Sequence, residues 1–191
     1  MNKARLLAVV LFAAALSVTP GHTQDMPKKD AAPKPAASAS EAVLAQWNDI
    51  GRKLIAMAED FPEDKYDFKP TPVVGSFAQR EIHAAHANQF FINALIGQKM
   101  PAMDDPKREE FRTKADVVAF VKKSFADGVA AIKAKGDKGM SDLVVDPFSN
   151  EQTRINDFAY GFIEHSGEIY GQLTVYYRVA GLVPPESRPK K

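Results

Sequence analysis

Residues 76–97 read SFAQREIHAAHANQFFINALIG, and this stretch decides the fold. Ser76 and Gln79 have the spacing of a capping box, and Gly97 is typical of a helix end, so the segment predicts one helix. Its apolar side chains cover most of the circumference of that helix rather than a single stripe. A helix that is apolar nearly all round is covered by other elements, which predicts a central position in the domain.

Three further segments supply the predicted neighbours of that helix. Each repeats apolar residues at three- and four-residue steps, as amphipathic helices do: residues 40–60, 114–135 and 150–180. Ser38 with Glu41 and Thr113 with Asp116 repeat the capping spacing, and Gly136 is expected to end the third segment. No alternation typical of a strand runs for more than a few residues. We therefore predict an all-α four-helix bundle without a sheet.

The N-terminal 23 residues have the pattern of a secretory signal peptide. Lys3 and Arg5 precede an unbroken apolar run over residues 6–16, and small or turn-forming residues follow it. The run is too short to span a bilayer, although a retained N-terminal anchor is the alternative reading. The predicted organisation is a signal peptide (1–23), a disordered spacer rich in Ala, Pro and Lys (24–39) and the bundle (40–188), in a periplasmic or secreted protein.

Composition excludes several classes of function. The 191 residues suffice for one domain, and the absence of cysteine excludes disulfides, thiolate metal sites and a cysteine nucleophile. The formal net charge is +1, and removal of Lys3 and Arg5 with the signal leaves about −1. That balance gives no electrostatic case for nucleic acid as a partner, and no stable membrane span is expected after signal cleavage.

Two histidines are the candidate chemical groups. His83 lies on a buried row of the second predicted helix, and His165 lies on a buried row of the fourth. Imidazoles on facing helices are how helix bundles build metal sites. The alternative is that each is a core histidine hydrogen-bonded to an ordinary acceptor, since no H-E-x-x-H motif is present.

Three stretches carry a resemblance to a known family. They are HAAHANQFF at 83–91, HSGEIYGQL at 165–173 and GLVPPES at 181–187, and they resemble the DinB-like (YfiT-like) superfamily. The resemblance implies a four-helix bundle in which three histidines hold a divalent metal ion. It also implies relatives that are thiol transferases using bacillithiol or mycothiol, or metal-dependent hydrolases.

This sequence has a histidine at two of the three metal-ligand positions that the resemblance implies. His83 and His165 match the family ligands, whereas Ile169 stands where the third histidine is expected. His86 and Glu168 are weaker candidates for a replacement ligand. The expected cofactor is a divalent cation (zinc, nickel or manganese), and its loss is the alternative because Ile169 offers no donor.

Two functions are consistent with these residues. One is a metal-dependent hydrolase or transferase that acts on an unknown small molecule, and the other is a non-catalytic bundle that binds a small apolar ligand or a protein partner. Family members often pair, so a homodimer is also expected, with Trp47 or the Pro184-Pro185 tail in its interface. Export argues against the thiol-transferase reading, because bacillithiol and mycothiol are cytoplasmic.

Overall fold

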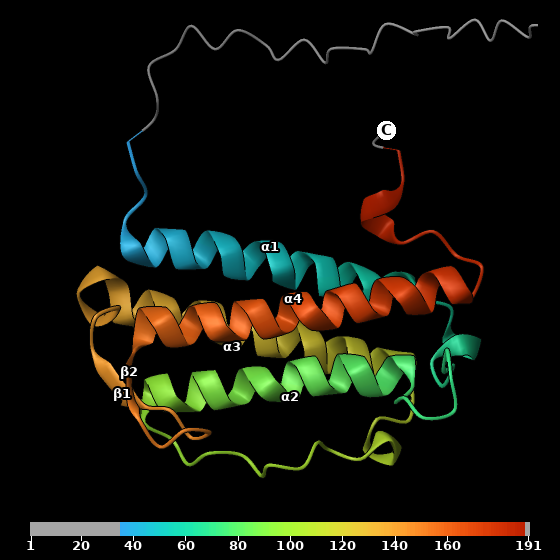
Figure 1. Cartoon of the computed structure of the whole chain (residues 1–191), viewed down its shortest axis with the longest axis horizontal. Coiled ribbons are helices and arrows are strands. Elements are labelled where there is room, and N and C mark those ends of the chain that lie inside the picture. Colours follow the sequence, from blue (N-terminus) through green and yellow to red (C-terminus); the bar gives the residue numbers. More distant parts are fainter. Residues whose placement is uncertain (1–34, 190–191) are drawn as a thin grey trace, which may run out of the picture. The chain divides into compact units, whose positions relative to one another are not determined.

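The computed structural model describes residues 35–189, and four long helices dominate them (Figure 1). They are α1 (Ala39–Asp60), α2 (Phe77–Ile96), α3 (Lys114–Gly139) and α4 (Ile155–Val179). The predicted all-α four-helix bundle is confirmed. The predicted signal peptide and most of the predicted spacer lie outside the described residues. None of the helices in the described part of the chain is long and apolar enough to cross a membrane.

The order of the helices around the bundle differs from their order in the sequence. α1 and α2 each pack against both α3 and α4, while α1 and α2 make few contacts with each other. Successive helices α1 and α2 are therefore diagonal partners, with α3 and α4 between them on opposite sides (Figure 1). This arrangement places α2 directly beside α4, so the two helices that carry His83 and His165 are neighbours.

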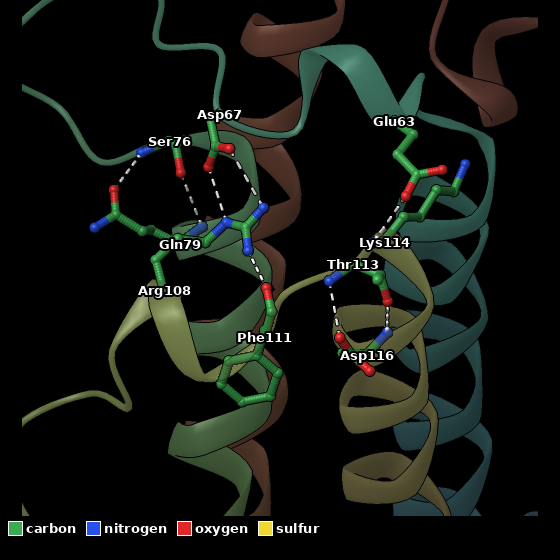
Figure 2. A network of polar contacts seen from close by, with 9 residues as sticks. All are labelled: Glu63, Asp67, Ser76, Gln79, Arg108, Phe111, Thr113, Lys114 and Asp116. Atoms are coloured by element: carbon green, nitrogen blue, oxygen red, sulfur yellow. Dashed lines mark hydrogen bonds and ion pairs between the residues drawn. The ribbon is translucent and has the colours of Figure 1, made fainter.

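Side-chain caps fix where three of the helices begin. The Ser76 hydroxyl accepts the backbone N–H of Gln79, and the Gln79 side chain accepts the backbone N–H of Ser76 at 2.7 Å (Figure 2). Thr113 and Asp116 repeat this exchange at the start of α3. The same pairing at Ser38 starts α1, so all three predicted capping boxes are confirmed.

One arginine holds the long connection between α2 and α3 against the bundle. Arg108 opens the short helix η2 (Arg108–Glu110), and its Nε donates to Asp67 Oδ1 at 2.8 Å (Figure 2). Its guanidinium also donates to the backbone carbonyl of Phe111. The connection also carries Asp105, so these contacts help to position that carboxylate beside α2.

The start of the fourth helix was predicted wrongly. Residues 150–154 are not helical: Gln152–Arg154 forms strand β2, which pairs antiparallel with β1 (Leu143–Val145). The expectation of no sheet is therefore also wrong. Strands of three residues, mostly exposed, are too short to show a period in the sequence. In α3 the predicted break at Gly136 is confirmed, because this glycine has φ 59° and ψ −175° and only a further turn follows it.

The core between α1 and α3 is built around one tryptophan. Trp47 is fully buried, contacts the rings of Phe91 and Phe125, and donates from Nε1 to the Phe125 carbonyl at 3.0 Å. Gly128 of α3 lies against the indole, where a Cβ would come within 2.5 Å of Trp47 Cε2. The expectation that Trp47 serves a dimer interface is therefore wrong, because none of its surface is exposed.

A carboxyl group without partners lies in the same core. Glu81 of α2 is fully buried, and neither of its oxygens has a hydrogen-bond partner. Burial raises the pKa of Glu81 well above its usual value. Burial also raises the pKa of Tyr66 and Tyr177, and the charge of an ionised Glu81 would raise both further. An ionised Glu81 is thus a cost to the folded state.

Replacing Glu81 with glutamine is expected to stabilise the protein in a pH-dependent way. The wild-type carboxyl is neutral in both states below its unfolded pKa near 4.5, so the two proteins differ least there. As pH rises the unfolded state ionises first, so wild-type stability falls relative to the variant, by at least about 1 kcal/mol at pH 8. Urea unfolding at pH 4, 6 and 8 measures this. A difference that stays constant with pH, or that also appears in the exposed control Glu151→Gln, would contradict it.

Candidate functional site

Two histidines meet where α2 lies beside α4. The Nε2 atoms of His83 and His165 are 3.1 Å apart, and the two rings are inclined by 72°. Both side chains are about one-third exposed, so they lie at the surface end of a cavity rather than deep in the core. The pair of residues that the sequence singled out on separate helices is therefore brought together.

A carboxylate fixes the ring tautomer of His83. Asp105, on the connection after α2, has its oxygens 2.8 and 3.0 Å from His83 Nδ1. A carboxylate only accepts hydrogen bonds, so Nδ1 carries the proton and donates it. With Nδ1 protonated, neutral His83 presents the lone pair of its Nε2 toward His165 Nε2, 3.1 Å away. Carboxylates in this outer position orient and strengthen metal-binding histidines in known sites.

His165 is held in its neutral form. Burial is the main cause that lowers its pKa below the usual value, and the positive charge of a protonated His83 would lower it further. Glu168, Glu164 and Asp105 act in the opposite direction without outweighing the burial. A neutral imidazole is the form that coordinates metals, so His165 is prepared for that role.

The distance between the two imidazoles fits a shared cation. Two nitrogens that each lie about 2.0–2.1 Å from one tetrahedral zinc ion are about 3.3 Å apart, close to the 3.1 Å found here. A complete set of protein ligands is not present: within residues 35–189 no group of three or more His, Cys, Asp or Glu is arranged to hold a metal ion. The residues fit two coordination positions and leave the others to water or substrate.

The remaining candidate residues make other contacts, although His86 lines the same cavity as His83 and His165. His86 is buried and its Nε2 donates to the Ala102 carbonyl at 2.9 Å, which ties the connection to α2. Glu168 lies on the other side of His165, with Oε2 3.7 Å from Nδ1. Ile169 is buried one turn after His165 and supplies no donor.

An aromatic cavity opens beside the histidine pair. Its volume is about 480 Å³, within the range of small-molecule sites. His83, His165 and Asp105 lie on its wall, and most of the remaining lining is apolar: Ala87, Phe90, Met103, Phe148, Phe158 and Phe162. The site therefore combines a few polar groups with a large apolar surface, as ligand pockets do.

The loop of the β1–β2 hairpin closes one side of this cavity. Phe148 is 57% exposed, and its ring lies 5.3 Å from that of Phe90 and 6.4 Å from that of Phe162. Asp146 holds the loop, because its carboxylate accepts the Phe148 N–H at 2.8 Å and the Ser149 hydroxyl at 2.9 Å. The hydrogen bonds of Asp146 thus hold the loop that carries this exposed phenylalanine beside the site.

Sequence reasoning missed Asp105 and the hairpin. Asp105 lies 22 residues after His83 in an irregular connection, where no spacing rule relates it to a helix face. Phe148 lies between the predicted helices 114–135 and 150–180, where the sequence shows no helix or strand pattern. Asp146, Pro147, Ser149 and Asn150 are turn-forming residue types, and this cluster is the sequence signal that could have indicated a hairpin. In the structure Asn150 has φ 60°.

Comparison with known proteins agrees with this architecture. The family model of the DinB superfamily matches residues 46–173. A DinB-like protein from Bacillus cereus is 18% identical, with a TM-score of 0.64 over 76% of this chain and 95% of its own. A DinB-like protein from Bacillus subtilis is also 18% identical, with a TM-score of 0.61 over 78% of this chain and 99% of its own.

A third solved structure carries a description of function. YfiT from Bacillus subtilis, described as a probable metal-dependent hydrolase with an unusual four-helix bundle topology, is 15% identical. Its TM-score is 0.56, over 82% of this chain and 97% of its own. At these identities the likeness to the solved structures establishes the fold alone. No curated protein matches the chain.

Proposed function

Because this chain belongs to the DinB superfamily, we propose that His83 and His165 together hold one divalent cation and that the site serves a metal-dependent hydrolase or transferase reaction. The observation that carries the proposal is the 3.1 Å separation of their Nε2 atoms, on two helices that the bundle places side by side. The description of YfiT as a probable metal-dependent hydrolase supports the same class of chemistry.

The residues around the pair have separate roles in this proposal. His83 and His165 bind the cation through Nε2, and Asp105 orients the His83 ring through Nδ1. When bound, a divalent cation acts as a Lewis acid toward a carbonyl or phosphoryl oxygen of the substrate. The phenylalanine-lined wall excludes water from one side of the site. With only two protein ligands, we expect weak binding and exchangeable metal.

Zinc titration of the protein purified without a histidine tag tests the proposal. We expect about one equivalent to bind in the micromolar range at pH 7.5, and His165→Ala to lose this binding, because one imidazole alone is a poor site. Thermal unfolding of the variant without metal checks that it is folded. Wild-type protein that takes up no zinc, nickel or manganese would contradict the proposal, as would equal uptake by His165→Ala.

The second candidate function is that of a non-catalytic bundle, which no longer binds a metal ion but retains the cavity. Ile169, buried where the third family ligand is expected, favours it, and so does the absence of any three-ligand group within residues 35–189. In that case the protein binds a small apolar ligand without catalysis. The zinc titration separates the two candidates, since only the first requires the cation.

The proposed site of action is outside the cytoplasm. The basic start and short apolar run of residues 1–23 support export, and the absence of cysteine suits any redox environment. Such a location leaves bacillithiol and mycothiol out of reach as cosubstrates, which favours a hydrolase over a thiol transferase. A homodimer remains a proposal, and light scattering measures it directly.

A further inference from the structure

The lining of the cavity beside the histidine pair is mainly aromatic. Four phenylalanine rings from three elements surround it: Phe90 from α2, Phe148 from the hairpin loop, and Phe158 and Phe162 from α4. Phe90, Phe148 and Phe162 have ring centroids about 5–6 Å from a neighbouring ring, in tilted arrangements. Aromatic rings attract further aromatic rings at such distances and angles, so the lining favours a ring over an alkyl chain.

The charges on the cavity wall are of one sign. Asp105 and Asp146 both line it, and no lysine or arginine of residues 35–189 does. Asp105 contacts His83, and Asp146 is committed to the hairpin loop, so both carboxylates are fixed in place. Bringing an anion into an apolar space beside fixed carboxylates is unfavourable both by desolvation and by repulsion. Without a bound cation, the lining therefore selects against anionic ligands.

From this combination we propose that the cavity binds an uncharged aromatic molecule of about two to three rings, with its reacting group against His83 and His165. The placement of the reacting group rests on the proposed function, while the binding of the aromatic body does not. The volume of about 480 Å³ accommodates a molecule of this size. Phe148 is the residue that sets the fit, because its loop supplies one wall of the cavity.

One glycine offers a way to close the cavity without disturbing the core. Gly161 of α4 is exposed and lines the cavity, and a Cβ added there meets no atom within 4 Å. Leucine at this position would project into open space and would also suit a helix better than glycine. Gly167 of the same helix likewise has no atom within 4 Å of an added Cβ, but it does not line the cavity. Gly167→Leu is therefore a matched control.

Two related fluorescent probes test the proposal. N-phenyl-1-naphthylamine is uncharged, and 1-anilinonaphthalene-8-sulfonate is the same molecule with a sulfonate. In the presence of EDTA, we expect the uncharged probe to bind wild-type protein and Gly167→Leu equally. Binding should weaken at least about tenfold in Gly161→Leu, and about three- to tenfold in Phe148→Ala, the range that one aromatic contact supplies. The sulfonated probe should bind wild type at least about tenfold more weakly than the uncharged one.

Each outcome decides a separate point. Equal affinities of Gly161→Leu and wild type for the uncharged probe would overturn the assignment to this cavity. Equal affinities of wild type for the two probes would overturn the charge selection. Because EDTA removes metal ions, probe binding with the expected pattern stands even where the zinc titration fails. Zinc binding without probe binding would instead overturn the inference and leave the proposed function intact.

Discussion

Replacing Gly128 with alanine is expected to lower the free energy of unfolding by about 3 kcal/mol. The new methyl group would overlap the indole of Trp47, which is fully buried and contacts the rings of Phe91 and Phe125. Relief requires a shift of the ring, of α3, or of both, and a shifted ring loses its hydrogen bond to the Phe125 carbonyl. Urea unfolding of the variant and of wild type measures the loss.

Two companion variants show whether the overlap is the cause. Trp47→Phe removes the part of the indole that faces Gly128, so the double variant should lose less stability than the two single losses combined. Gly171→Ala is an exposed helical position where an added Cβ meets nothing within 4 Å, and it should stabilise by about 0.5–1 kcal/mol. Strict additivity in the double variant would show that Gly128 matters for another reason.

Replacing Ile169 with histidine is expected to raise zinc affinity more than about 100-fold. Ile169 lies one helical turn after His165, on the same side of α4, so an imidazole there would supply the third ligand that the sequence resemblance predicts at this position. Loss of an outer-shell partner typically costs 10–100-fold in metal affinity, and a direct ligand should exceed that range. Calorimetric titration with zinc measures the change.

The control for this variant places the same side chain one turn further along. Leu173 is buried on the same row of α4. Leu173→His therefore buries one imidazole, as Ile169→His does, but at a position one turn further from the His83–His165 pair. We expect it to lose stability and to leave zinc affinity unchanged. An Ile169→His protein that binds zinc no more tightly than wild type would show that this turn of α4 does not face the site.

The parts of the fold that could be predicted are those determined by local chemistry. The capping boxes at Ser38, Ser76 and Thr113 depend on residues three apart, and the structure has all three. The break at Gly136 likewise depends on one backbone position. These features could be predicted from the sequence because each depends only on residues that are close together in the chain.

The unpredicted parts depend on contacts across long sequence separations. The hairpin that carries Phe148 has strands of three residues, and it is held by its loop and by Ile155 N–H donating to the Asp142 carbonyl. Asp105 reaches His83 from an irregular connection that Arg108 and His86 anchor to the rest of the bundle. The pairing of His83 with His165 was expected from helix faces, and their contact needed the helix order that the fold supplies.

The diagonal placement of α1 and α2 has a consequence for how the chain folds. In a simple up-and-down bundle each helix docks on the one made just before it, so early hairpins form from local contacts. Here α1 packs on α3 and α4, and the hydrogen bond from Trp47 to Phe125 spans 78 residues. Native contacts of such long range slow folding, because loop-closure entropy is lost before they form. We therefore expect this bundle to fold more slowly than up-and-down bundles of equal size.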